Sequence, residues 1–165
     1  MKTATWLFVW FALCLTATAG GKKEKSLVVT FHLQGEEGEG KKIAVPEMVA
    51  GRQVFFRLAP EISHNNVAAF RPFPAEDGYS YGIVLQMNDV GRQRLASVTN
   101  ANKGALLLAR LNGRPLDVLK IDQGINDGFI VIWQGVTAQE IAMADSMMPR
   151  IGESLKEWKQ KKKDK

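Results

Sequence analysis

The chain has 165 residues, a formal net charge of +5 and one cysteine. This length suits a single domain, and one cysteine excludes a disulfide framework within the chain. Six lysines lie in the last ten residues, KEWKQKKKDK, whereas residues 20–155 hold fifteen basic and fifteen acidic side chains. A neutral body without a basic face argues against nucleic-acid binding, which depends on clustered positive charge.

The beginning of the chain, MKTATWLFVWFALCLTATAGG, has the pattern of a secretory signal. An apolar run from Trp6 to Leu15 is followed by Ala17-Thr18-Ala19, a small-x-small cleavage pattern. Residues 1–19 are therefore expected to be a signal peptide, which predicts an exported protein, periplasmic or extracellular. An uncleaved N-terminal anchor is the alternative, and it is disfavoured because a spanning helix needs about 20 apolar residues.

The next segment combines a polar leader, a strand and a charged loop. Residues 20–25, GGKKEK, form the leader, and residues 26–34 alternate apolar and polar side chains as in a half-buried strand. The loop at 35–42, GEEGEGKK, has the glycine and lysine spacing of a phosphate-binding loop. It lacks the Ser or Thr that would hold magnesium, and no helical pattern follows, so no nucleotide is expected there.

Two further strands are predicted before residue 80. They lie at 52–58 and 66–73, and Pro72 and Pro74 place the second at a sheet edge because proline cannot donate to a ladder. Residues 36–50 carry no assignable pattern.

The two histidines of the chain are weak candidates for a metal site. His32 falls on the polar face of its strand, and His64 lies in the polar sequence SHNN. Zinc needs three or four converging ligands, so both histidines are expected to face solvent. Neither a metal nor any other cofactor is expected.

From Tyr81 the sequence pattern becomes clearer. The alternating run YGIVLQM predicts a strand, and Asn88 or Asp89 can then cap a helix that carries Leu95 and Val98. Gly104 is expected to end this helix.

A hairpin is predicted next. Residues 105–111, ALLLARL, are apolar on both faces, as in a strand that is covered on both sides. Asn112-Gly113 is the dipeptide best suited to a two-residue turn, and PLDVLKI is the returning strand.

The last predicted elements are a strand and a helix. A turn at 126–128, NDG, precedes the strand at 129–134. Thr137 and Glu140 form a capping box for a helix that Pro149 ends or kinks. The apolar stripe of this helix is Ile141, Ala144 and Met148.

From residue 81 the order is therefore β-α-β-β-β-α, with additional strands before it. This order packs most simply as two helices on one face of a mainly antiparallel sheet, which defines an α+β domain. The domain is expected to span residues 26–152, and residues 153–165 form a basic tail.

Catalytic patterns are scarce. No Gly-x-Ser-x-Gly motif is present, and the clustered acids are Asp117, Asp122 and Asp127, in or beside turns. Aspartates at such positions usually bond their own backbone, so a carboxylate-dependent hydrolase is the least favoured reading and the chain is expected not to be an enzyme.

Candidate partner surfaces lie near the C-terminus. Met147, Met148 and Trp158 can form an adaptable apolar contact, unless one methionine enters the core. The basic tail is either solvated and disordered or attracted to an anionic membrane surface or an acidic partner. Its lysines at the end of the chain are Lys159, Lys161, Lys162, Lys163 and Lys165.

A resemblance is visible in the motif residues between Tyr81 and Met148. Fold-forming glycines and helix caps follow one another without a gap at fixed spacing over this segment. These residues are Gly91, Leu95, Thr99, Gly104, Leu111, Asn112, Gly113, Gly128, Gly135, Thr137 and Glu140. The segment resembles the head subdomain of the first periplasmic domain of SecD, a protein-export subunit.

The resemblance implies a free-standing relative of the SecD head, whose role in the family is to contact exporting polypeptide outside the membrane. Asp117-Val118-Leu119 departs from the Ser-Ala-Pro that is usual in the family after the hairpin, which puts a shared partner surface on that strand in doubt. We therefore expect an exported, non-enzymatic binding module that contacts polypeptide in export or envelope assembly. The alternative is an envelope protein that docks a folded partner, and the sequence leaves the oligomeric state open.

Overall fold

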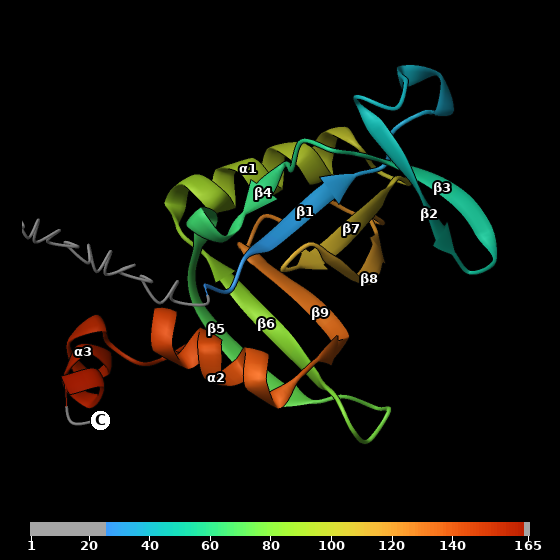
Figure 1. The fold of residues 1–165 in the computed structure, drawn as a ribbon. Coiled ribbons are helices and arrows are strands. Elements are labelled where there is room, and N and C mark those ends of the chain that lie inside the picture. The colour runs from blue at the N-terminus through green and yellow to red at the C-terminus, as the bar shows by residue number, and fades with distance from the viewer. Residues whose placement is uncertain (1–25, 164–165) are drawn as a thin grey trace, which may run out of the picture.

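The structure, a computed structural model, describes residues 26–163. The predicted signal peptide, the polar leader and Lys165 lie outside these residues. In chain order the elements are β1 (Val29–Leu33), the 3-10 turn η1 (Glu37–Glu39), β2 (Ala44–Val49), β3 (Arg52–Arg57), β4 (Ile62–Ser63), the 3-10 turn η2 (His64–Asn66), β5 (Val67–Pro74), β6 (Tyr81–Met87), α1 (Asp89–Ala101), β7 (Leu106–Leu111), β8 (Arg114–Lys120), β9 (Phe129–Val136), α2 (Ala138–Met147) and α3 (Leu155–Lys163). Figure 1 shows their arrangement.

The named strands pair in three antiparallel groups. A four-stranded sheet has the order β4-β1-β7-β8, a three-stranded sheet has the order β5-β6-β9, and β2 and β3 form a separate hairpin arm. The α+β class and the order β-α-β-β-β-α from residue 81 are confirmed. The proline-containing β5 lies at a sheet edge, as predicted.

Local signals explain where α1 and the β7–β8 hairpin begin and end. The Asn88 side chain caps α1 by accepting a hydrogen bond from the Gly91 backbone N–H at 2.8 Å. In the hairpin turn, Asn112 has a φ of 52° and Gly113 a φ of 81°, the left-handed pair that a two-residue hairpin requires. The same turn also bonds to the residue that precedes β1, because the Asn112 N–H donates to the Val28 carbonyl at 2.8 Å.

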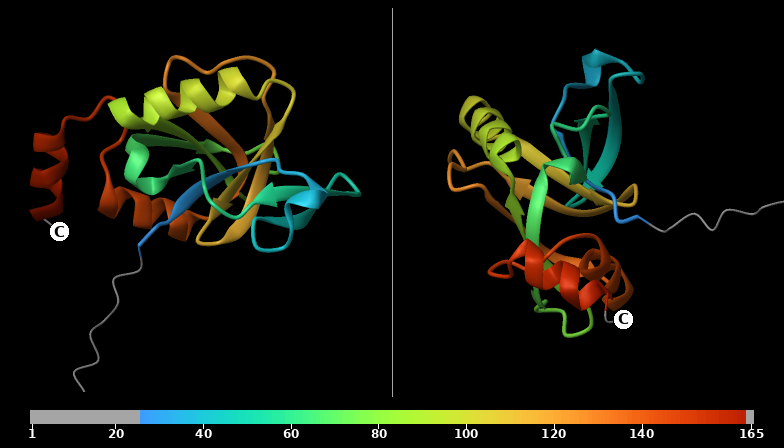
Figure 2. Two further views of the ribbon diagram at one scale, coloured as in Figure 1. Left: turned by 90° about the horizontal axis from the view of Figure 1, so that it is seen from above. Right: turned by 90° about the vertical axis from the view of Figure 1, so that its left-hand side faces the viewer.

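Both sheets and both long helices contribute to one apolar core. Alternate residues of the strands supply it, among them Phe31, Ile83 and Ile132, and Leu95 from α1 and Ala144 from α2 join the same cluster. Figure 2 shows α1 and α2 on different sides of the strands. The two helices therefore close one core between two sheets, whereas the sequence suggested that both helices pack on one face of a single, mainly antiparallel sheet.

The arm formed by β2 and β3 covers the second face of the four-stranded sheet. Gln34 at the end of β1 bridges to Phe56 of the arm, and Phe56 is fully buried although it lies outside the main core. Leu108 of β7 is buried on this side as well, which is why β7 is apolar on both faces. An ion pair between Arg110 of β7 and Glu47 of β2 fastens the arm.

His32 does not face solvent, contrary to the sequence-based expectation. It is 8% exposed because the arm lies against its strand. Its Nδ1 lies 2.8 Å from the Arg57 carbonyl and its Nε2 lies 2.9 Å from the Thr30 hydroxyl. A carbonyl accepts hydrogen bonds and cannot donate, so Nδ1 carries the proton and Nε2 accepts from Thr30 in the neutral ring. His64 is also partly buried, and its Nδ1 has no partner in the described part of the chain.

The basic tail is not disordered over its described length. Residues 155–163 form α3, and Glu157 accepts hydrogen bonds from the backbone and the hydroxyl of Ser154 at 2.9 and 2.7 Å. This is a capping box, a local signal that the lysine-rich composition obscured.

We expect Gly91→Ala to destabilise the fold by about 1–3 kcal/mol, the usual cost of overpacking. A Cβ at this position would lie 2.5 Å from the Asn66 carbonyl oxygen and 2.8 Å from the Asn66 Cβ. Urea denaturation measures the change. Val90→Ala, on the exposed side of the same helix turn, is the control and should stay within about 0.5 kcal/mol. Equal stability of the two variants would contradict the close approach of α1 to η2.

We expect the stability of the fold to fall as the pH drops below about 6.5, the ordinary pKa of histidine. Burial, together with the nearby Arg110, lowers the pKa of His32 even though the Arg57 carbonyl favours the charged ring. The folded state then binds fewer protons than the unfolded state, so the contribution of His32 is complete above the unfolded pKa and is lost as the pH falls through the folded pKa. Urea denaturation at a series of pH values should show a smaller loss of stability in His32→Gln than in the wild type, and an equal loss in the two proteins would contradict the prediction.

Candidate functional site

Most of the motif residues form local structure. Thr137 caps α2 by accepting from the Glu140 N–H at 3.2 Å, and the Glu140 carboxylate accepts from the Thr137 N–H at 2.8 Å. Arg114 of β8 donates to both oxygens of Glu140 at 3.1 Å, which ties the hairpin to α2. Thr99 is buried in α1, and its hydroxyl accepts from the Ile125 N–H at 2.8 Å. Gly104 and Gly128 have positive φ angles in the connections, and Gly135 has one near the end of β9.

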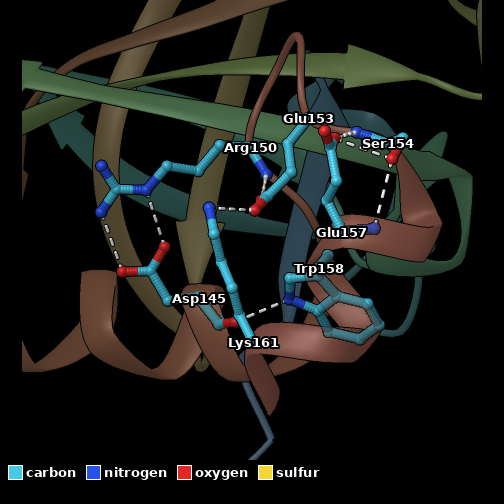
Figure 3. A network of polar contacts seen from close by, with 7 residues as sticks. All are labelled: Asp145, Arg150, Glu153, Ser154, Glu157, Trp158 and Lys161. Carbon is cyan, nitrogen blue, oxygen red and sulfur yellow. Dashed lines mark hydrogen bonds and ion pairs between the residues drawn. The ribbon is translucent and has the colours of Figure 1, made fainter. Parts of the chain in front are cut away.

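A polar network joins α2 to α3 (Figure 3). Arg150 makes a two-pronged ion pair with Asp145 at 2.8 and 2.9 Å, and its backbone N–H donates to Glu153 at 3.1 Å. Glu153 also pairs with Lys161 at 2.6 Å, and the Trp158 indole N–H donates to the Asp145 carbonyl at 2.9 Å. These contacts line a cleft of about 420 Å³ between the two helices.

The charges in this network stabilise one another. The hydrogen bond from Lys161 and that from the Arg150 backbone lower the pKa of Glu153. The same ion pair raises the pKa of Lys161, and the contact with Asp145 raises the pKa of Arg150. Glu153, Lys161 and Arg150 are therefore charged near neutral pH, and their ion pairs make the cleft a structural junction between α2 and α3.

The three predicted apolar contact residues do not share an open surface. Met148 is buried at 8% exposure, and Met147 packs partly against the core while its sulfur lies 2.9 Å from the Leu27 N–H. Trp158 is half-buried between α2 and α3. Met148 is therefore the methionine that enters the core, as the alternative interpretation expected, and it is not available to a partner surface.

The lysines of the tail divide into two sets. Lys161 pairs with Glu153, and Lys162 donates to the Ser146 carbonyl at 3.1 Å while its ammonium lies 5.4 Å from the Trp158 ring centre. Lys159 and Lys163 are exposed.

The three turn aspartates serve local structure. Asp117 accepts from its neighbour Val118 at 2.8 Å and from the Trp133 N–H at 2.8 Å, which links β8 to β9. Asp127 accepts from the Phe129 N–H at 3.0 Å, and Asp122 pairs with Lys120. Residues 26–163 contain no group of three or more His, Cys, Asp or Glu side chains that could hold a metal ion.

An apolar surface that the sequence analysis missed lies on the outer face of the three-stranded sheet. Ile130 and Ile132 of β9 point into the core with α2, so the alternate side chains point away from it. The pairing of β6 with its neighbours β5 and β9 places Phe73, Val84 and Val131 on this outer face. We call the set Phe73, Val84, Phe129, Val131 and Trp133 the outer apolar face; its members are half-buried or exposed, and Trp133 is 61% exposed.

Phe73 and Trp133 form the centre of this face. Their ring centres lie 6.0 Å apart at an angle of 74°, an edge-to-face pair. Gly82 makes the arrangement possible, because a Cβ there would lie 2.2 Å from the Phe73 ring. A hollow of about 300 Å³ adjoins the pair, and it is lined by Phe73, Pro74, Glu76, Trp133 and Gln134.

The loop beside the hollow is held by its own hydrogen bonds. Asp77 accepts from the backbone N–H groups of Tyr79 and Ser80 at 3.0 and 2.8 Å, and the Ser80 hydroxyl accepts from the Gly135 N–H at 2.9 Å. The Ser80 hydroxyl and amide lower the pKa of Asp77, which keeps this carboxylate ionised. Tyr79, which belongs to this loop, is 86% exposed.

One sequence signal could have located this surface. In FIVIWQ the residues that alternate with the two core isoleucines are Phe129, Val131 and Trp133. An apolar residue at each of these positions is unusual for a strand with one solvated face.

Comparison with known proteins reveals a structural likeness. No family model matches the chain, and no curated protein matches it. A solved structure of "a membrane component SecDF that enhances protein export" aligns over 73% of this chain and 62% of its own, with 19% identity and a TM-score of 0.53. SecDF in its super-membrane-facing form aligns over 71% of this chain and 18% of its own, with 20% identity and a TM-score of 0.50.

The chain therefore has a SecD-like fold, as the resemblance of the motif residues implied. At this identity the likeness is one of fold, and the chain spans less than two thirds of either SecDF chain. Within residues 26–163 no helix is long and apolar enough to cross a membrane.

We expect Trp158→Phe to loosen α3 without affecting α2. Phenylalanine retains an aromatic ring but loses the N–H that bonds the Asp145 carbonyl. Loss of a hydrogen bond worth about 1 kcal/mol should raise amide exchange in α3 about fivefold, measured by hydrogen–deuterium exchange. Trp133→Phe is the matched control and should leave α3 unchanged. Unchanged exchange in Trp158→Phe would show that this bond does not fasten the helix.

Proposed function

We propose that this chain is an exported, non-enzymatic binding module that contacts polypeptide as an accessory to protein export or envelope assembly. The observation that carries the proposal is the SecD-like fold, which extends over 73% of the chain in a likeness to a membrane component that enhances protein export. Fold alone does not transfer activity, so the argument also needs a surface suited to the task.

The outer apolar face supplies such a surface. Trp133 and Phe73 offer aromatic area beside a hollow, and neighbouring valines extend it along the sheet. An exposed aromatic side chain with partly exposed apolar neighbours is typical of interaction sites. Aromatic rings accept many apolar side chains without demanding one sequence, which suits an unfolded chain.

The chemistry of the described residues fits binding better than catalysis. The carboxylates of Asp117 and Asp127 accept hydrogen bonds from backbone N–H groups. The charged groups of the α2–α3 cleft form ion pairs with one another. The polar residues that line the Phe73–Trp133 hollow are Glu76 and Gln134, and the lining contains no Ser, Thr, Cys, His or Lys. A contact surface needs none of the groups that an enzyme would require.

The test is an amide NMR titration of residues 20–165 with an unfolded, export-competent polypeptide. Shifts should be confined to β5, β9 and the loop at 75–80, next to Phe73 and Trp133. Shifts elsewhere would move the contact site, and no shifts at high excess of polypeptide would reject the proposal in favour of a dedicated folded partner.

Trp133→Ala should weaken polypeptide binding about 5- to 30-fold, the effect of losing about 1–2 kcal/mol at a central aromatic contact. The fold should persist because the indole is largely exposed and the Asp117 bond uses the backbone. Val90→Ala is the matched control, since Val90 is also 61% exposed but lies on α1. Fluorescence anisotropy of a labelled polypeptide gives both affinities. Equal affinities in the two variants would remove Trp133 from the site.

A further inference from the structure

The outward side of α3 presents an uncompensated row of positive charge. Lys156, Lys159 and Lys163 are exposed and stand three, four and seven residues apart, so they lie along one side of the helix. Gln160 shares this side. None of the three lysines has an ion-pair partner within residues 26–163.

The other side of α3 is already occupied by contacts with the body. Trp158, Lys161 and Lys162 bond to Asp145, Glu153 and Ser146, respectively. These contacts, of which Figure 3 draws those of Trp158 and Lys161, fix which side of the helix points away from the protein. The lysine row is therefore held in a constant orientation.

The acidic residue of α3 does not neutralise this row. The Glu157 carboxylate accepts hydrogen bonds from the Ser154 N–H and the Ser154 hydroxyl at 2.9 and 2.7 Å, and the Glu157 N–H donates to the Ser154 hydroxyl at 3.2 Å. These bonds lower the pKa of Glu157 and hold its carboxylate at the beginning of the helix. Leu155, 61% exposed, lies one turn before Lys159 and adds an apolar side chain next to the lysines.

We propose that this side of α3, formed by Leu155, Lys156, Lys159 and Lys163, docks the protein on the surface of an anionic lipid bilayer. Phosphate headgroups present negative charge as a plane, and a row of flexible ammonium groups fits a plane without needing defined partner positions. The exposed leucine can enter the boundary between headgroups and acyl chains.

The structure favours a bilayer over a nucleic acid as the partner. Nucleic-acid surfaces combine basic residues with aromatic rings that stack on bases. The aromatic residue of α3, Trp158, is on the opposite side and bonded to α2. The outward side of the helix therefore offers charge and one leucine but no ring.

The helix lies on the membrane and does not enter it. Its nine residues extend about 13 Å, and most are charged, which rules out spanning. Each lysine near an anionic surface contributes about fivefold in affinity, so the three together contribute about a hundredfold. Such binding is reversible and sensitive to salt.

The experiment is vesicle co-sedimentation with residues 20–165, which contain every described element of the fold. Vesicles are made of phosphatidylcholine alone or with phosphatidylglycerol. We expect binding to the anionic vesicles, little binding to the neutral ones, and loss of binding between about 0.05 and 0.5 M salt. Equal binding to both vesicle types would overturn the proposal.

Matched variants locate the surface. The triple variant that combines Lys156→Gln, Lys159→Gln and Lys163→Gln should lower partition onto anionic vesicles about a hundredfold. The control combines Lys41→Gln, Lys42→Gln and Lys103→Gln, which removes the same charge from other exposed positions, and it should change partition less than tenfold. Equal losses in the two triple variants would show that net charge, not α3, drives binding and would overturn the proposal.

A soluble polyanion separates a lipid from an acidic protein. If poly-glutamate binds the chain as tightly as anionic vesicles do, per charge, the partner is an acidic polypeptide and the bilayer assignment is wrong. Leu155→Ser should weaken vesicle binding but leave poly-glutamate binding unchanged, because the leucine contributes only at a lipid boundary. Circular dichroism confirms that each variant keeps its helices. These readouts are independent of polypeptide binding at Trp133.

Discussion

Burial of one face of the four-stranded sheet against one face of the three-stranded sheet is the constraint on which the rest of the structure depends. Phe31 of β1, Leu107 of β7 and Ile132 of β9 are each at most 1% exposed and belong to the same cluster. The two sheets cannot close this core alone, so α1 and α2 complete it with Leu95 and Ala144. The glycines and caps between the strands serve this arrangement, because each connection must turn the chain back toward the same cluster.

The outer faces of the two sheets differ in whether another part of the protein covers them. The hairpin arm covers the outer side of the four-stranded sheet, burying Phe56 and enclosing His32 under the Arg57 carbonyl. The outer side of the three-stranded sheet keeps Phe73 and Trp133 accessible. Apolar area that is not used for stability is available for binding, which is why the proposed polypeptide contact lies there.

The C-terminal helix adds a second surface with a different chemistry. The Asp145–Arg150 and Glu153–Lys161 pairs and the Trp158 indole fix α3 against α2, and the lysines that remain face outward. One surface is apolar and aromatic and the other is cationic, and they belong to different elements. The proposed contact with polypeptide and the proposed contact with lipid can therefore be altered separately.

Much of this structure could be predicted from the sequence, and the exceptions have a common cause. Period-two alternation in YGIVLQM, the Asn112-Gly113 dipeptide and the Thr137–Glu140 box act over a few residues, so they determined β6, the hairpin turn and the start of α2. The division into three strand groups, the burial of His32 by the arm and the exposure of Trp133 depend on contacts between distant segments. The sequence by itself therefore determined the order and type of the elements from β6 to α2, whereas the lysine-rich composition of the tail obscured α3. Tertiary structure decided which faces are covered, because burial depends on what packs against a strand and not on the strand alone.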